Sequence, residues 1–260
     1  MNQGITMTAE MIGAEFLKLR KKRGLLAWAL LLAVGSSIVF FAWKAIQHAS
    51  NSTHPPAGGL LGYQHALALL GVFVGPLAAV LIGAEAGAGD VATGVFRDLV
   101  VTGRSRLALF AARIPGALML CLSVVALGYG VALAGTFLFA GGMSTPSLAT
   151  VLNGFGWVLL VDGAVCVVAV GLASLTGSRP ATVTALIGLE LVVSPLLLQS
   201  SSLGSVRRAL LDSSVLHLAP TVSDGTPVVP ESLFVALLVM VLWLAVAAGL
   251  GAWRTSTMDA

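Results

Sequence analysis

The sequence has few charged residues. Asp, Glu, Lys and Arg together make up 10% of the 260 residues, whereas soluble domains average about 25%. Hydrophobic residues make up 57% of the chain, and the mean hydropathy is +0.98. A chain of this length cannot bury so much apolar surface in one aqueous core. The composition therefore excludes an ordinary soluble domain and predicts an all-α integral membrane protein.

Motifs that carry chemistry are also missing. No Gly-Lys pair occurs, so there is no phosphate loop of the G-x-x-x-x-G-K-[ST] type, and HExxH, GxSxG and CxxC are absent. The two cysteines, Cys121 and Cys166, lie in apolar runs and are expected to be free, buried thiols. The sequence therefore predicts no enzyme activity, metal site or cofactor in this chain. The net charge of +3 lies beside apolar runs, which indicates membrane topology rather than nucleic-acid binding.

Six apolar runs are long enough to cross a bilayer, which needs ~20 residues per helix. They are residues 24–46, 60–84, 107–139, 151–176, 181–199 and 232–253. We expect residues 1–260 to form one transmembrane domain. Within the second run, Gly71 and Gly75 have the four-residue spacing that permits close helix packing, and Pro76 is expected to kink the helix.

Residues 1–23 are predicted to lie on the cytoplasmic side as an interfacial helix. Met11, Ile12, Phe16 and Leu19 fall near one helical face, and a dense basic cluster follows at residues 18–23. The same cluster also fits a simple topological stop signal, and both interpretations stay open. A cleaved signal peptide is disfavoured because the apolar run that follows is longer than a signal's apolar region.

The basic residues predict the orientation of the chain. With six spans, eleven of the fourteen Lys and Arg residues fall on one side, and only Lys44, Arg207 and Arg208 fall on the other. Because basic residues beside spans stay in the cytoplasm, both termini are expected there. Residues 200–231 then form the longest outer segment, with a short amphipathic helix expected at the outer surface around Leu211 and Val215.

Residues 85–113 are the long charged interruption in the first half of the chain. They contain four arginines together with Glu85, Asp90 and Asp98. We expect a cytoplasmic loop, because these charges cannot remain unpaired in lipid. Arg113 is expected to extend toward the headgroups. Residues 92–99 can form a short helix whose apolar side chains would dock in the groove of a partner.

Two acidic residues, Asp162 and Glu190, lie near the middle of their predicted spans. At 1.5 Å per residue both are about 18–24 Å from the turn near Ser178, so they could face the same interior. An ionised carboxylate there costs roughly 2.5–3.5 kcal/mol on insertion scales. Two interpretations remain open: a substrate-path or proton site, or a protonated or hydrogen-bonded acid that fixes helix packing.

The charged stretch and the overall architecture resemble the membrane subunit of type-2 ABC exporters. The residues that carry the motif resemblance are Glu85 through Gly94, Leu99, and the run Thr102-Gly103-Arg104-Ser105-Arg106, which is similar to an E…G-T…L…P-x-S-R pattern. Gly94 follows Thr93 instead of preceding it, and Gly103 stands where proline is common. The architecture covers most of the chain, whereas the motif covers only residues 85–106.

The resemblance implies a permease that exports a substrate with ATP hydrolysed by a separate subunit. It implies a cytoplasmic coupling helix that docks on that ATPase. The residues expected to take part are Val95, Phe96, Arg97, Asp98, Leu99, Arg104 and Arg106. ATP and Mg would be bound by two ATPase copies, and a second permease chain would complete a homo- or heterodimer in a bacterial plasma membrane. The alternative is a stand-alone proton-coupled carrier that uses Asp162 and Glu190.

Overall fold

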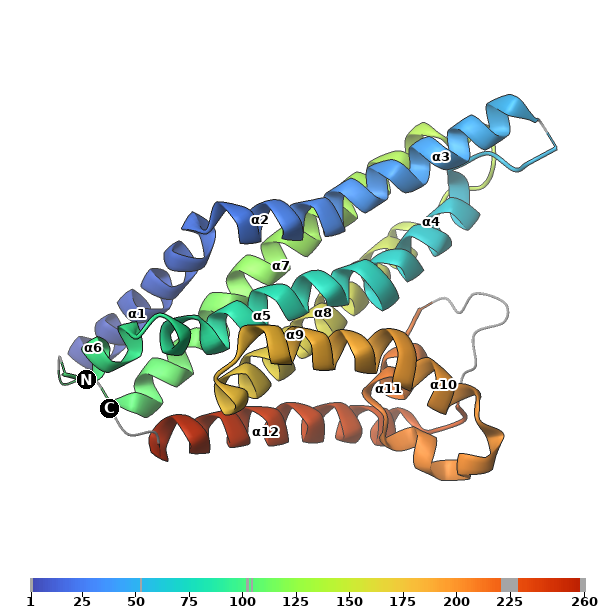
Figure 1. The fold of residues 1–260 in the computed structure, drawn as a ribbon. Helices are drawn as coiled ribbons and strands as arrows, with labels where there is room; N and C mark the ends of the chain where they lie inside the picture. Colours follow the sequence, from blue (N-terminus) through green and yellow to red (C-terminus); the bar gives the residue numbers. More distant parts are fainter. Residues whose placement is uncertain (1, 52, 102, 104, 221–228, 258–260) are drawn as a thin grey trace.

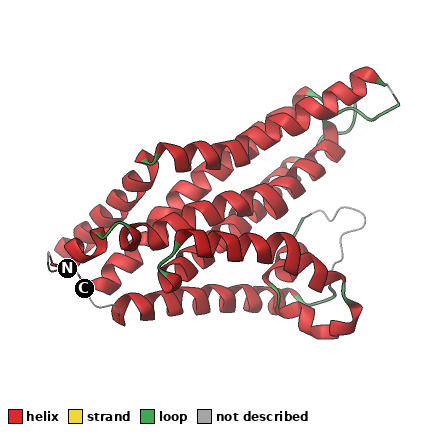
Figure 2. Ribbon diagram, in the orientation of Figure 1, coloured by secondary structure: helices red, strands yellow, loops and turns green. Residues whose placement is uncertain are grey.

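The computed structural model describes residues 2–51, 53–101, 103, 105–220 and 229–257, and in this part of the chain the side chains of residues 2–8, 96, 97 and 99 are not described. The described residues form helices joined by short turns, and they contain no β-strand (Figure 2). This agrees with the all-α class predicted from composition.

Within the described residues, six helical units are long and apolar enough to cross a membrane. They are Arg23–Ser50, Gly59–Ala92, Arg106–Leu138, Leu148–Thr176, Arg179–Gln199 and Leu233–Thr257. The six predicted spans are therefore confirmed as helices of sufficient length and apolarity. Successive units run in opposite directions, so α1 and the end of the sixth unit lie at the same end of the bundle (Figure 1).

Three of the units contain a π-helical turn. The first consists of α2 (Arg23–Leu30), η1 (Leu31–Gly35) and α3 (Ser36–Ser50); the second of α4 (Gly59–Ala68), η2 (Leu69–Val74) and α5 (Gly75–Ala92); the fifth of α9 (Arg179–Gly188), η3 (Leu189–Val193) and α10 (Ser194–Gln199). The others are α7 (Arg106–Leu138), α8 (Leu148–Thr176) and α12 (Leu233–Thr257). Four further helices are α1 (Asn2–Lys21), α6 (Val95–Val101), the 3₁₀ helix η4 (Ser201–Ala209) and α11 (Leu211–His217).

The charged stretch 85–113 differs from the expected loop. Helix α5 continues eight residues beyond the predicted end at residue 84, and α7 begins at Arg106. Only α6 and its short flanking links lie outside the long helices. The expectation of a loop over the whole stretch was wrong because Glu85 and Asp90 are paired inside the bundle and need not leave it.

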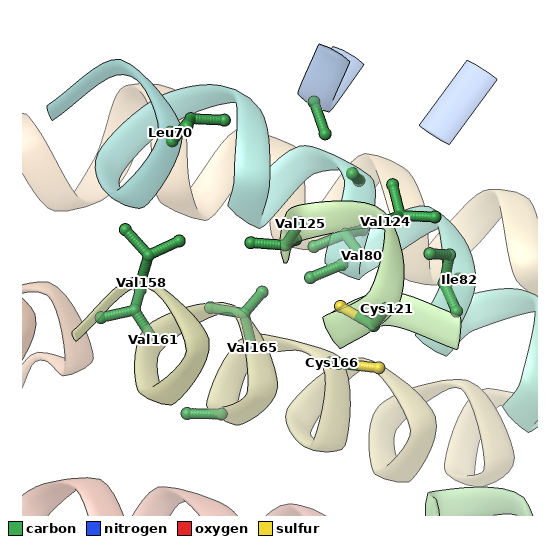
Figure 3. Close-up of a cluster of buried hydrophobic side chains, with 14 of the residues drawn as sticks. Leu70, Val80, Ile82, Cys121, Val124, Val125, Val158, Val161, Val165 and Cys166 are labelled. Atoms are coloured by element: carbon green, nitrogen blue, oxygen red, sulfur yellow. The ribbon is translucent and has the colours of Figure 1, made fainter. Parts of the chain in front are cut away.

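Helix α8 is the centre of the bundle. Its most apolar window is 72% buried, against 17% for α12, whose outer face is covered with exposed Leu, Val and Phe side chains. Val158, Val161 and Val165 of α8 pack toward α5 and α7 in the cluster shown in Figure 3. The cysteines of α7 and α8 are both free and buried, as predicted.

Small residues allow α5 to approach α8 closely. A Cβ atom added at Gly83 would lie 2.5 Å from the carbonyl oxygen of Cys166, and one at Gly87 would lie 2.5 Å from that of Val170. The four-residue spacing that the sequence shows at Gly71 and Gly75 thus continues along the same helix face. Close backbone approach through such residues is a common way to pack helices in lipid.

The segment between the fifth and sixth units folds back against the bundle. Leu211 and Val215 of α11 are buried in the main core. The buried indole of Trp157 on α8 donates a hydrogen bond of 3.0 Å to the carbonyl of Val215. The helix predicted at the outer surface is therefore present but packs inward, because α8 supplies both apolar contacts and a polar partner.

Candidate functional site

An ionic network occupies the end of the bundle that carries α6. We define it as Lys18, Lys22, Glu85, Asp90, Arg113 and Arg179. Asp90 accepts hydrogen bonds of 3.0 and 2.9 Å from the Lys18 ammonium and one of 3.4 Å from Arg113. Glu85 pairs with Lys22, and its other oxygen lies 2.7 Å from the Arg179 guanidinium. Lys18 also pairs with Glu15 one helical turn earlier.

Arg113 is the most deeply buried member of the network, with only 1% of its surface exposed. Besides Asp90, its guanidinium donates a 3.3 Å hydrogen bond to the carbonyl of Gly87. The Ser174 hydroxyl donates to the same carbonyl over 3.2 Å. The expectation that Arg113 reaches the headgroups was wrong, because two acceptors on α5 hold it inside the bundle.

The network joins α1, α5, α7 and α9 immediately before α6 begins. Sequence analysis assigned these charges to topology and missed their pairing. The partners are 63 and 72 residues apart for the Lys22–Glu85 and Lys18–Asp90 pairs, so no local spacing could reveal them. The available signal was a pair of acids beside a basic cluster on the same predicted side of the membrane.

The expected coupling residues lie on and after α6. Val95 and Val101 are 42% and 78% exposed, and Asp98 is exposed as well. Arg106 begins α7 and donates a 3.3 Å hydrogen bond to the backbone carbonyl of Ser256 at the end of α12. The side chains of Phe96, Arg97 and Leu99, and the whole of Arg104, lie outside the described residues.

A cavity of about 180 Å³ lies between the middle of the second unit, α8, η3 and α11. Most of its wall is apolar, with Phe73, Val161 and Leu216 among the lining side chains. The polar groups in the wall are the carboxyls of Glu190 and Asp212 and the amide of Gln199. The cavity is therefore an apolar chamber with acidic groups in its wall.

Two of the π-helical turns border this cavity, and each is followed by a proline. Pro76 follows η2 and Pro195 follows η3. Proline lacks the N–H that would bond to the carbonyl four residues earlier, and its ring crowds that carbonyl. The residues affected are Val72 and Leu191, and both line the cavity together with the two prolines. The wider π turns accommodate the prolines and are frequent at functional sites. The kink at Pro76 stays a prediction, and the structure shows a π turn directly before this proline.

Asp162 lies on α8 between Val161 and Val165, which line the cavity. It is fully buried, and neither carboxylate oxygen has a hydrogen-bond partner among the described residues. A Cβ atom on Gly75 would lie 2.6 Å from both oxygens, so the absence of a side chain there makes room for the carboxyl group.

Glu190 lines the cavity and Asp162 adjoins the lining residue Val161, so both acids singled out in the sequence lie beside one cavity. Asp212 was missed by sequence analysis. It sits in a segment predicted to lie outside, yet it lines the same cavity as Glu190. Within the described residues, no group of three or more His, Cys, Asp or Glu side chains has the arrangement of a metal site.

The chain was compared with known proteins. No protein-family model matches it, and no curated protein is significantly similar to it.

Proposed function

We propose that this chain is the membrane-spanning permease subunit of an ABC exporter. The observation that carries the proposal is that an exposed short helix directly follows a helix whose end is fixed by ion pairs. Helix α6 presents Val95 and Val101 outside the bundle, and it directly follows α5, whose end is held by the ionic network. A seven-residue helix with exposed apolar side chains gains stability from a partner groove.

The partner in this proposal is a separate ATPase. The chain has no phosphate loop of its own, so the nucleotide and its Mg must be bound elsewhere. Two ATPase copies serve a homo- or heterodimer of permease chains in a bacterial plasma membrane, with both termini in the cytoplasm. Motion of the docked α6 passes into α5 because α6 follows α5 after only two intervening residues. The network then carries that motion to α1, α7 and α9.

The test of this proposal is Phe96→Ala in α6. Truncating an aromatic anchor commonly costs ~2 kcal/mol or more of docking energy. We expect weaker association with the ATPase subunit and loss of substrate-stimulated hydrolysis, with normal membrane insertion. Phe234→Ala is the matched control, because Phe234 is exposed at the opposite end of the bundle. Pull-down and ATPase activity are measured in the same reconstituted samples, and wild-type values for Phe96→Ala in both would remove α6 as the coupling element.

A second candidate function is a stand-alone proton-coupled carrier. The buried Asp162 carboxyl, which has no hydrogen-bond partner within the described ranges, favours it. Intramembrane acids of this kind often mark proton pathways. Transport driven by a pH gradient in vesicles that contain only this chain would support the carrier, whereas an absolute need for an ATPase and ATP would reject it. Asp162→Asn and Glu190→Gln, singly and together, would retain transport if both acids serve only packing.

A further inference from the structure

Among the described residues, the wall of the cavity beside η2 and η3 is apolar with acidic groups and contains no basic side chain. Of its fourteen lining residues, two are acids, one is an amide, and the others are apolar or glycine. Asp162 adds a third carboxyl just behind the wall, and this carboxyl has no hydrogen-bond partner in the part of the chain that the structure describes. Such groups are costly to bury alone, and a cation or a proton is the partner that offsets this cost.

Two backbone carbonyls in the cavity wall lack the donor that a regular α-helix would supply four residues later. The prolines at 76 and 195 cannot donate to the carbonyls of Val72 and Leu191, which belong to the lining. Arg207 of η4 does not line the cavity. Its guanidinium donates to the carbonyls of Leu198 and Gly204 over 2.9 and 3.1 Å. Arg207 is thus held by backbone acceptors and leaves the carboxyls of the cavity without a basic partner in the wall.

We propose that this cavity binds a small organic monocation with an apolar body. The cationic nitrogen lies near Glu190 and Asp212, and the body packs against Phe73, Val161 and Leu216. A volume of about 180 Å³ is below the roughly 300–1,000 Å³ of drug-sized pockets, so the ligand is small. A hard metal ion would require about six oxygen ligands, which this mainly apolar wall does not supply. Whether the cation is the transported substrate rests on the proposed function, but its binding does not.

The test uses the purified permease chain in detergent, without ATPase or ATP. Isothermal titration calorimetry with benzyltrimethylammonium is compared with benzenesulfonate, which has a similar ring and the opposite charge. We expect saturable binding of the cation and none of the anion. A negative result in this titration would not bear on the proposed docking of α6 to an ATPase. A negative result in the Phe96→Ala test would not bear on the proposed cation site.

Variants then locate the site. Glu190→Gln and Asp212→Asn should each weaken cation binding roughly tenfold or more, because each removes a charge partner in a poorly solvated cavity. Glu10→Gln is the matched control, since it removes an exposed acid of α1 at the other end of the bundle and should leave the affinity unchanged. Circular dichroism and gel filtration establish that each variant is folded.

Two results would overturn the proposal. Equal or absent binding of benzyltrimethylammonium and benzenesulfonate by the wild-type protein would do so without any variant. Wild-type cation affinity in the folded double variant Glu190→Gln/Asp212→Asn would do so as well. In either case Glu190 and Asp212 would serve only to pack α11 against η3.

Discussion

Gly83 offers a direct test of how α5 packs on α8. In Gly83→Ala the new Cβ atom would lie 2.5 Å from the carbonyl oxygen of Cys166, 2.6 Å from the Cβ of Ala169 and 3.1 Å from the amide nitrogen of Val170. Two of these three atoms belong to the backbone of α8, so no side-chain rotation can relieve the overlap. The two helices must move apart instead.

The size of the effect follows from that separation. Moving the Cys166 oxygen from 2.5 Å to the 3.4 Å at which ordinary contacts begin requires about 0.9 Å. A gap of 0.5–1 Å forfeits roughly a quarter to a half of each dispersion contact along the interface. Overpacking of this kind typically costs about 1–3 kcal/mol. Alanine's better helix propensity offsets roughly 0.5–1 kcal/mol, so we expect a net loss of up to about 2.5 kcal/mol, with a middle value of about 1 kcal/mol.

Gly130→Ala is the matched control. Gly130 lies within α7 and is exposed, and a Cβ atom there would have no heavy atom within 4 Å. This variant should be as stable as the wild type or slightly more stable. Unfolding by sodium dodecyl sulfate in bicelles, followed by circular dichroism, measures both variants. Equal stability of Gly83→Ala and Gly130→Ala would refute the close approach of α5 and α8.

Two further predictions concern topology and the ionic network. Single cysteines at Ser105 and Ser256 should resist a membrane-impermeant thiol reagent in intact cells, whereas one at Ser202 should react. Labelling of the first two from outside would show that the inferred orientation is wrong. Arg113→Leu should lower stability by about 3 kcal/mol, the lower end for breaking a buried ion pair, because Lys18 still pairs with Asp90. The same unfolding titration tests it, and a variant as stable as the wild type would show that the guanidinium contributes nothing.

Where the spans lie could be predicted because length and apolarity are local properties. A run of ~20 apolar residues must form a helix in lipid, whatever lies beside it. The prediction was wrong at the second span, which ends at Ala92. Its last eight residues contain Glu85 and Asp90, and their partners on α1, α7 and α9 decide whether those charges may stay in the bundle.

The candidate site was predictable only in part. Asp162 and Glu190 could be singled out because an acidic residue within an apolar run can be recognised from the sequence alone. The packing of α8, η3 and α11 against one another decides the rest. It places both acids beside one cavity, brings Asp212 into the cavity wall and leaves the Asp162 carboxyl without a hydrogen-bond partner among the described residues. The coupling residues 96, 97, 99 and 104 stay predictions, since their side chains lie outside the described residues.

The sequence by itself determined an all-helical membrane chain with six spans, because solvation in lipid acts on each segment separately. It also identified the two acids within the spans and the charged stretch as polar groups that lipid does not solvate. Only the tertiary structure decided which charges pair and where α11 packs. Those outcomes depend on groups far apart in the chain, where a few ångströms separate a satisfied ion pair from an unpaired charge.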